Sequence, residues 1–369
     1  MFAGRFTGKT VLVTGHTGFK GAWLAIWLEQ LGARVVGYSL PPPTTPNLFE
    51  ACRLAARLEH IEADIRDTDR VAQAINGSKP DFIFHLAAYP LVREAYENPL
   101  AAYDTNVMGT LSLLDAVRRN AHPCVIVVVS TDKCYENKEW AYGYRESDRL
   151  GGHDPYSASK AAMEIAVASY RLAYFPPTRA GEHGVYLATV RAGNVIGGGD
   201  WARDRLMPDA VRALSRGETL KVRNPTSVRP WQHVLEPLSG YLWLAAKLAA
   251  EGGPYASAWN FGPLATEVYT VADLADAIVR AWGTGGWQPF ETTDAPHEAG
   301  RLMLSIDKAR VDLGWQPVWN FHTAVERTVG WYRAFCVDTA DYRKIYQACA
   351  ADIKAYEGAA SRTGLAWTS

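Results

Sequence analysis

Three glycines at three-residue spacing stand directly after a short apolar run near the N-terminus. The run Thr10–Thr14 has the composition of a buried strand, and Gly15, Gly18 and Gly21 introduce a helical pattern that extends to Leu31. Glycines in such a turn permit a tight bend and let backbone N–H groups approach a pyrophosphate at the helix N-terminus. The strand–turn–helix context predicts a dinucleotide site rather than a turn that uses glycine for geometry alone.

Further apolar runs alternate with helical patterns through the first half of the chain. Such continuous runs are typical of strands buried on both faces of a parallel sheet. The alternation predicts an α/β fold, a doubly wound parallel (Rossmann) sheet with a smaller C-terminal substrate-binding lobe. The strands are expected at Arg34–Ser39, Ile61–Asp64, Phe82–Ala87, Cys124–Ser130 and Tyr186–Arg191.

The texture of the sequence changes after Arg191. Residues 194–200 are rich in glycine, and residues 200–230 are rich in arginine and lysine. We expect residues 1–191 to form the dinucleotide-binding domain, which the chain re-enters later, and residues 192–358 to form mainly the substrate lobe. Residues 359–369 are expected to be a loosely held tail.

Composition excludes several classes of protein. The net charge of −1 gives no global field for nucleic acid. Five cysteines without a CxxC pair suit reduced thiols in the cytoplasm, and nine histidines without ligand spacing predict no metal site. The stretch Tyr241–Ala250 is too short for a membrane span, and residues 1–10 carry no apolar leader. We expect a cytoplasmic protein without nucleic-acid or membrane partners.

Tyr156 and Lys160 lie four residues apart at the start of a predicted helix, Ser157–Phe175, and so project from one face. A neighbouring ammonium group together with a cationic nicotinamide would lower the pKa of the phenol, and the phenolate can take a proton from a hydroxyl while hydride leaves the same carbon. The alternative is a surface pair on an amphipathic helix. The interpretation as a reaction centre is favoured by Ser130 and Thr131, which lie at the end of an upstream strand and supply hydroxyl groups for the same reaction.

Asp132 and Lys133 directly follow those hydroxyls. Removal of water beside a new ketone requires an acid and a base close together, whereas oxidation and reduction alone do not. Asp132 can supply the acid, and Lys133 can act as base if its pKa is depressed. The alternative is a solvated pair in a loop.

Polar residues elsewhere are candidates for ligand contacts. Arg205, Lys221 and Arg229 belong either to a diphosphate clamp or to a solvated face, and Asn260 either joins that clamp or serves a turn. Asp64 follows the third strand, where it either meets an adenine or caps a loop. The second strand ends without an acidic residue, so this position leaves the choice between NAD and NADP open.

With these residues identified, the sequence resembles the extended short-chain dehydrogenase/reductases, and among them the CDP-glucose 4,6-dehydratases, over nearly its whole length. A lysine in Thr-Asp-Lys is typical of the CDP-sugar enzymes, whereas dTDP- and GDP-sugar relatives carry an acid there. The chain departs from the pattern at Tyr89, where glutamine is expected, and at residues 305–307. The matching strings are residues 14–21, 130–135, 143–146, 151–157, 191–201 and 229–237.

The resemblance implies an NAD-dependent lyase. CDP-D-glucose would be oxidised at C4 with Tyr156 as base and Lys160 on the ribose. Water would leave across C5 and C6 through Lys133 and Asp132, and hydride would return to C6. The product would be CDP-4-dehydro-6-deoxy-D-glucose, a precursor of the dideoxysugars of surface polysaccharides such as O-antigen.

The resemblance also implies the remaining site residues. The catalytic set is Thr131, Asp132, Lys133, Tyr156 and Lys160, and the substrate set is Asn194, Arg205, Lys221, Arg229 and Asn260. The NAD set is Gly15, His16, Thr17, Gly18, Phe19, Lys20, Gly21, Asp64, Ile65, Leu86, Ala87, Ala88, Asn106, Ser130, Tyr156 and Lys160. A homodimer or homotetramer would form through helices at 99–120 and 157–175.

Three alternatives stay open. A nucleotide-sugar 4-epimerase shares every redox residue but does not need Asp132 and Lys133. A dehydratase for another nucleoside-diphosphate hexose fits the same motifs. A non-catalytic NAD-sensing regulator typically loses the tyrosine–lysine pair, which is intact here.

Overall fold

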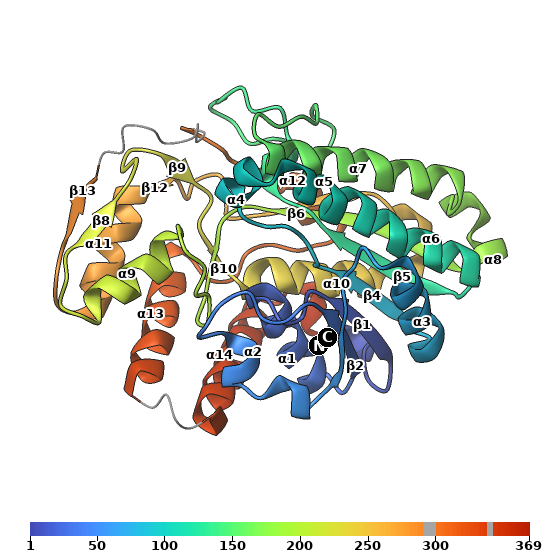
Figure 1. The fold of residues 1–369 in the computed structure, drawn as a ribbon, viewed down its shortest axis with the longest axis horizontal. Coiled ribbons are helices and arrows are strands. Elements are labelled where there is room, and N and C mark those ends of the chain that lie inside the picture. The colour runs from blue at the N-terminus through green and yellow to red at the C-terminus, as the bar shows by residue number, and fades with distance from the viewer. Residues whose placement is uncertain (291–299, 338–341) are drawn as a thin grey trace.

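The computed structural model describes residues 1–290, 300–337 and 342–369. Its centre is a seven-stranded sheet with the order β11-β6-β5-β4-β1-β2-β3, in which all neighbouring strands are parallel (Figure 1). The prediction of a parallel α/β sheet is confirmed. The strands are β1 (Thr10–Thr14), β2 (Arg34–Ser39), β3 (Glu59–Glu62), β4 (Phe82–His85), β5 (Cys124–Val129), β6 (Val185–Ala192) and β11 (Ala258–Phe261).

Helices cover both faces of this sheet. The main ones are α1 (Phe19–Gln30), α3 (Thr68–Ser78), α6 (Thr110–Asn120), α7 (Pro155–Ala173), α10 (Leu235–Glu251) and α14 (Tyr342–Arg362). Successive strand residues face opposite sides, so Leu12 packs in one apolar cluster with α3, α6 and α7. Val11 and Val13 pack in the other with α1, α10 and α14.

A smaller lobe follows the carboxyl end of β6. Its helix α11 (Val271–Trp282) packs against α9 (Leu206–Leu214) and α13 (Phe321–Val337). The chain returns to the sheet for β11, so the segment 192–358 contributes to both parts. The paired strands of the lobe are β7 (Val195–Ile196) with β10 (Gln232–His233), β8 (Leu220–Val222) with β13 (Trp287–Pro289), and β9 (Val228–Arg229) with β12 (Tyr269–Thr270).

Short helices fill the connections. They are α2 (Leu48–Ala51), α4 (Val92–Glu97), α5 (Pro99–Tyr103), α8 (Ala180–His183) and α12 (Asp307–Asp312), with 3₁₀ turns η1 (Phe2–Gly4), η2 (Leu54–Ala56), η4 (Asp132–Cys134), η5 (Pro177–Arg179), η6 (Gly253–Tyr255) and η7 (Ala366–Thr368). None of the helices in the described ranges is long and apolar enough to cross a membrane.

The third strand lies two residues earlier than predicted. It was expected at Ile61–Asp64, but β3 pairs with β2 from Val36–Glu59 to Ser39–Glu62. Because β3 is an edge strand with exposed ends, backbone pairing rather than an apolar run sets its position.

The predicted helix over 99–120 is interrupted. Between α5 and α6 lies a π-helical segment, η3 (Asp104–Gly109). Such segments insert an extra residue into a helix and often occur at functional sites. In this protein the segment contains the buried Asn106.

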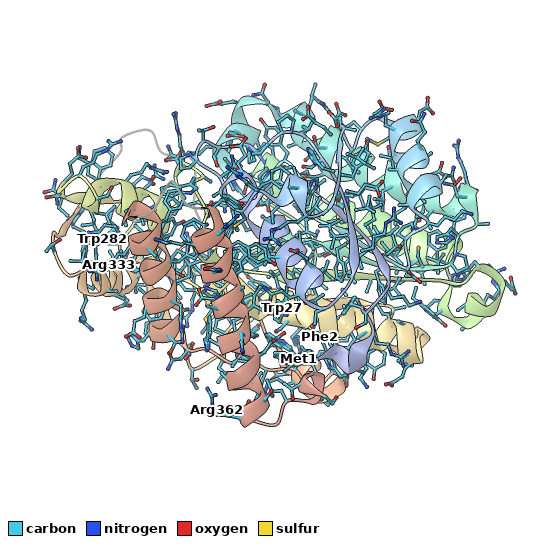
Figure 2. The ribbon with its side chains drawn as sticks, turned by 90° about the horizontal axis from the view of Figure 1, so that it is seen from below. Met1, Phe2, Trp27, Trp282, Arg333 and Arg362 are labelled. Atoms are coloured by element: carbon cyan, nitrogen blue, oxygen red, sulfur yellow. The ribbon has the colours of Figure 1, made fainter. Side chains whose placement is uncertain are left out.

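The expectation of a loosely held C-terminal tail is wrong. Trp367 is fully buried, and its ring stacks on Phe2 with the centroids 5.1 Å apart. The amide of Ala3 donates to the carbonyl of Ser369 at 2.9 Å, so the two termini lie side by side (Figure 1). Figure 2 shows Phe2 beside Trp27 of α1, which packs edge-on against both Phe2 and Trp367. The last residues thus complete an aromatic core that α1 alone leaves open.

Candidate active site

The glycine loop between β1 and α1 has the shape of a phosphate cradle. Gly15 has φ +74°, and a Cβ there would lie 2.7 Å from the amide nitrogen of Ala87. A Cβ at Gly21 would collide with the carbonyl oxygen of Gly15. Gly18 caps α1 without a side-chain hydrogen bond, so the first N–H groups of this twelve-residue helix are left to an anion. These residues fit a dinucleotide pyrophosphate.

Two buried side chains form the wall behind this loop. The His16 ring fits against Gly37, where any Cβ would overlap it, and its Nε2 lies 2.8 Å from Nδ1 of His60. Burial lowers the pKa of His16 to about 3, so the ring is neutral. The Thr17 hydroxyl bonds the Ser39 hydroxyl at 2.8 Å.

The predicted adenine contact, Asp64, is engaged with Arg66. Both of its carboxylate oxygens accept from the Arg66 side chain at 2.6–3.0 Å, and this hydrogen bonding lowers the pKa of Asp64. Ile65, its neighbour, is buried and packs against Gly109 of the π segment. A ligand would therefore meet Asp64 as half of an ion pair.

The loop after β4 is held by a buried hydrogen-bond chain. The Thr14 hydroxyl bonds Nδ1 of His85 at 2.7 Å and accepts from the amides of Leu86 and Ala87 at 3.1 Å. Asn106 accepts from the amide of Tyr89 at 2.8 Å and donates to the Ser159 hydroxyl at 2.9 Å. Asn106 thereby joins the loop 86–89 to helix α7.

The predicted catalytic residues meet at the carboxyl end of β5. The Thr131 hydroxyl donates to Oδ1 of Asp132 at 3.0 Å, and it lies close enough to Tyr156 to lower the pKa of that phenol. Nζ of Lys133 lies 3.4 Å from the same oxygen of Asp132. The other carboxylate oxygen, Oδ2, is buried without a partner in the described part of the chain. Tyr156, Thr131, Asp132 and Lys133 thus form one contiguous polar cluster.

The electrostatics of Tyr156 differ from the expectation that Lys160 lowers its pKa. Burial raises the pKa of Tyr156 to about 12, opposed by the Thr131 hydrogen bond and by the charge of Arg205. Lys160 donates to the carbonyl of Val129 at 2.8 Å, and burial lowers its own pKa to about 8. In the protein alone, the cation that favours the phenolate is therefore Arg205.

Lys20 is a half-buried cation near these catalytic residues. It was predicted as part of the glycine loop, but its ammonium is close enough to Arg205, Asp132 and Lys160 to interact with their charges. Burial, followed by Arg205, lowers the pKa of Lys20 to about 8. Its Nζ lies 3.5 Å from the Tyr241 hydroxyl.

Arg205 lies by the reaction centre. Its guanidinium pairs with Asp200 at 2.8 Å, and Asp200 is held by the amide of Ala202 and by the Tyr332 hydroxyl on its carbonyl. The charge of Asp200 raises the pKa of Arg205. The sequence suggested Arg205 either for a diphosphate clamp or for a solvated face, and in the fold it is also close enough to Tyr156 for their charges to interact.

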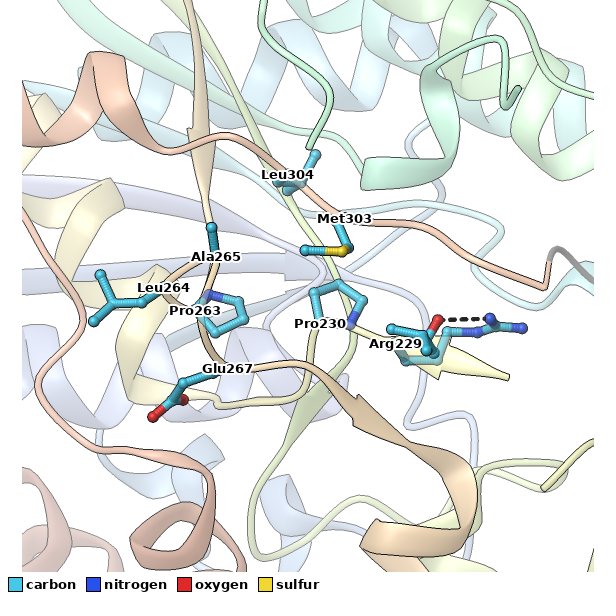
Figure 3. A pocket seen from close by; sticks show the side chains of 9 residues that line it. Arg229, Pro230, Pro263, Leu264, Ala265, Glu267, Met303 and Leu304 are labelled. Carbon is cyan, nitrogen blue, oxygen red and sulfur yellow. Dashed lines mark hydrogen bonds between the residues drawn. The ribbon is translucent and has the colours of Figure 1, made fainter. Parts of the chain in front are cut away.

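Arg229 and Pro230 border a pocket of the lobe (Figure 3). A Cβ at Gly193 would meet both the Pro230 ring and, at 3.1 Å, Oδ2 of Asp132. The next residue is Asn194. Its side-chain oxygen Oδ1 is buried and has no hydrogen-bond partner among the described residues. The rest of the pocket is lined by Val228, Pro263, Leu264, Ala265, Glu267, Met303 and Leu304.

Two predicted substrate contacts are not brought to this site. Lys221 is exposed on β8, with its ammonium 5.3 Å from the centre of the Phe290 ring. Asn260 is fully buried, and its amide donates to the carbonyls of Tyr144 and Ser305 at 2.9 and 3.1 Å. Both N–H groups of Asn260 are satisfied inside the protein, so the prediction that it donates to phosphate is wrong.

A buried ion pair beside the catalytic residues was missed. Arg191 on β6 and Glu164 on α7 are 3% and 2% exposed and make two hydrogen bonds, of 2.8 and 2.9 Å. The signal was present in the sequence, because an arginine within an apolar strand requires a buried partner. No group of three potential metal ligands occurs in residues 1–290, 300–337 and 342–369.

Comparisons with known proteins agree with this geometry. A family model described as GDP-mannose 4,6 dehydratase matches residues 12–328. The CDP-glucose 4,6-dehydratase of Salmonella typhimurium is 48% identical over 328 residues, which cover 89% of this chain and 91% of that protein. A UDP-glucose 4-epimerase of Rhizobium meliloti is 29% identical over 88% of this chain and 97% of that one.

Solved structures show the same fold. DesIV of Streptomyces venezuelae, a dTDP-glucose 4,6-dehydratase solved with NAD and TYD bound, superposes with a TM-score of 0.74. It is 26% identical, and the match covers 88% of this chain and 97% of that one.

Proposed function

The chain belongs to the GDP-mannose 4,6-dehydratase family of extended short-chain dehydrogenase/reductases, and on that basis we propose that it dehydrates CDP-D-glucose to CDP-4-dehydro-6-deoxy-D-glucose. The observation that carries the proposal is the contiguous polar cluster of Tyr156, Thr131, Asp132 and Lys133. It combines a phenol suited to oxidation with an acid and an amine suited to elimination.

The cofactor of the proposed reaction is NAD. The open helix N-terminus, the cradle at Gly15 and Gly21, and the loop 86–89 would hold its pyrophosphate and ribose. When bound, NAD supplies the acceptor for a hydride from the sugar, and in its reduced form the donor that returns this hydride in the same turnover. The reaction is therefore redox-neutral overall.

The first half-reaction is assigned to Tyr156. Its phenolate takes the proton of the C4 hydroxyl, and the charge of Arg205 stabilises that phenolate. The Thr131 hydroxyl can add a hydrogen bond to the phenolate by turning its one proton away from Asp132. Lys160 is placed by its bond to Val129 and would donate to the ribose from the same face of α7.

The second half-reaction is assigned to Asp132 and Lys133. Lys133 takes the proton from C5, and Asp132 protonates the hydroxyl that leaves C6 as water. When hydride is returned to C6, Lys133 gives a proton back to C5. Asp132 is 0% exposed, so its proton is delivered away from bulk water, and its unpartnered Oδ2 is the oxygen available to the substrate.

Substrate contacts are assigned to the lobe. The Arg229 guanidinium, which points away from the pocket in Figure 3, would bind the diphosphate, and the nearby Asn194 Oδ1 would accept from a sugar hydroxyl. The cytidine nucleotide is supported by the 48% identical relative, which is a CDP-glucose enzyme. The product would feed a dideoxysugar route such as that of O-antigen in the cytoplasm.

We also infer that two copies associate through α7 and the α5–η3–α6 helix. Large apolar side chains on these helices face solvent in the single chain, which is typical of a protein interface. Pairing across a two-fold axis would bury them in a four-helix bundle, as a dimer or within a tetramer. The most exposed are Leu100 (78%), Leu172 (73%), Ile165 (60%) and Met108 (55%).

The test is substrate conversion by the purified protein. CDP-, dTDP-, UDP- and GDP-glucose are supplied separately with NAD, and products are identified by mass and NMR. A 4-keto-6-deoxy product from CDP-glucose, without net NADH, is expected. A C4 epimer of the sugar as the sole product would contradict the proposal in favour of an epimerase.

A further inference from the structure

Tyr135 directly follows the 3₁₀ turn that carries Asp132 and Lys133. Its side chain is 1% exposed, and its hydroxyl accepts from Nη1 of Arg191 at 2.7 Å and donates to Oδ1 of Asn260 at 2.8 Å. Burial raises the pKa of this phenol above its ordinary value, so it stays neutral with one proton to donate. The hydroxyl therefore has a single fixed orientation between β6 and β11.

Arg191 extends this connection to the catalytic helix. Its guanidinium makes two hydrogen bonds with Glu164, which lies one turn beyond Lys160 on α7. Although burial opposes it, the Arg191 charge lowers the pKa of Glu164, so the pair is ionic. The Thr189 hydroxyl donates a further hydrogen bond to the Glu164 carboxylate at 2.8 Å.

The other end of the network is equally satisfied. The backbone amide of Asn260 donates to Oε1 of Glu146 at 2.8 Å, and both side-chain N–H groups of Asn260 are bonded. Fully satisfied polar networks inside a protein impose one geometry on the elements that they join. The turn itself is weakly held, because its closing bonds, Lys133 N to Thr131 Oγ1 and Cys134 N to Thr131 O, are 3.3 and 3.4 Å long.

We propose that Tyr135 is a positioning residue that keeps the elimination pair, Asp132 and Lys133, in register with the redox pair, Tyr156 and Lys160. The connection runs from Tyr135 through Arg191 and Glu164 to α7. The proposal rests on the function proposed above, since it assigns elimination to the turn. Loss of the Tyr135 hydroxyl should then slow elimination more than oxidation.

The chain offers a matched control in Tyr144. Its ring stacks on Tyr135 with centroids 5.3 Å apart, and it is 2% exposed. Its hydroxyl, however, donates to Asn137 and accepts from the amide of Lys138, and neither belongs to the network. Tyr144 contributes only its backbone carbonyl to the network, as an acceptor from Asn260, so Tyr144→Phe removes an equally buried hydroxyl and keeps the bonds of the network.

The experiment compares Tyr135→Phe and Tyr144→Phe with the unaltered enzyme in single turnovers of CDP-glucose with NAD. In Tyr135→Phe we expect product formation to fall about tenfold or more, the scale of a small misplacement of catalytic groups. NADH should accumulate transiently, C5 exchange with solvent deuterium should slow, and the Michaelis constant should stay within about twofold. Tyr144→Phe should show the same relative rates of oxidation and elimination as the unaltered enzyme.

The NADH formed per folded subunit shows whether each variant retains its active site. Arg191→Lys is a second variant, because it keeps a positive charge for Glu164 but its shorter side chain does not reach Tyr135. Like Tyr135→Phe, it should slow elimination more than oxidation. Two results would overturn the positioning role alone. One is that both half-reactions slow equally in Tyr135→Phe and in Tyr144→Phe, and the other is that Tyr135→Phe forms product at the unaltered rate. An unaltered enzyme that makes no 4-keto-6-deoxy sugar from CDP-glucose would overturn the proposed function and this role together.

Discussion

Lys133 and Asp132 share one ion contact but differ in their access to solvent. Nζ of Lys133 lies 3.4 Å from Oδ1 of Asp132, and the Lys133 side chain is 32% exposed whereas that of Asp132 is 1% exposed. A group that exchanges its proton after each turnover needs such access, whereas an acid that acts on a leaving hydroxyl works best away from water. This difference suits Lys133 as the base and Asp132 as the acid.

Lys133→Met should stop the reaction halfway. Tyr156 and Thr131 remain in place, so oxidation at C4 proceeds, and the enzyme should hold NADH and a 4-keto hexose. The measurement is NADH absorbance together with C5 solvent-deuterium exchange. Tyr156→Phe is the comparison and should form no NADH. Exchange at the unaltered rate in Lys133→Met would assign the C5 proton to another group.

Arg229→Ala should weaken substrate binding more than turnover. A diphosphate contact acts alike on substrate and transition state, so its loss raises the Michaelis constant. We expect a cost of about 2–3 kcal/mol, as for hydrogen bonds to charged groups. Lys221→Ala, at the one exposed residue of β8, is the control and should leave the Michaelis constant unchanged. The reverse pattern would move the diphosphate site to β8.

Arg205→Met should shift the pH dependence of oxidation to higher pH. Arg205 opposes the effect of burial on Tyr156, whose pKa is raised to about 12. Without that cation the neutral phenol is favoured, so less phenolate is present at any pH below the pKa. We expect a displacement of about one pH unit, the scale of one nearby charge. NADH formation in single turnovers across neutral to alkaline pH is measured, and Arg205→Lys should retain most of the unaltered profile.

Trp367→Ala should destabilise the folded protein. Its ring is fully buried against Phe2, Trp27 and Tyr356, and truncation of such a tryptophan costs about 3–5 kcal/mol. Thermal and denaturant unfolding measure the change. Arg362→Ala, exposed at the end of α14, should lie within about 0.5 kcal/mol of the unaltered protein. Equal stability of the two variants would mean that the C-terminal residues add nothing to the core.

Ile165→Glu with Leu172→Glu should dissociate the assembly. Both side chains are exposed on α7 and would be buried between two copies, where a carboxylate is costly. Light scattering on a gel-filtration column should give a smaller mass than for the unaltered protein. Val311→Glu, at a residue 81% exposed on α12, is the control and should leave the mass unchanged. A monomeric unaltered protein would refute the interface.

The sequence by itself determined the sheet and the two local pairs of residues in the candidate reaction centre. Buried strands such as β5 have no polar face, so their apolar runs are visible in the sequence, and Gly15 and Gly21 stand where the backbone leaves no room for a Cβ. Tyr156 and Lys160 are four residues apart on one helix, and Asp132 and Lys133 are adjacent. The short spacing along the sequence therefore predicted that the two members of each pair lie close together.

Only the tertiary structure decided which polar residues face a ligand and which face the protein. Asn260 and Arg205 both looked like phosphate contacts, but partners remote in sequence occupy the first, and the path of the chain after β6 carries the second to Tyr156. The edge strand β3 and the C-terminal Trp367 were misplaced because backbone pairing and long-range aromatic packing define them. Hydrogen bonds and burial between distant segments depend on the three-dimensional path of the chain, which spacing along the sequence does not encode.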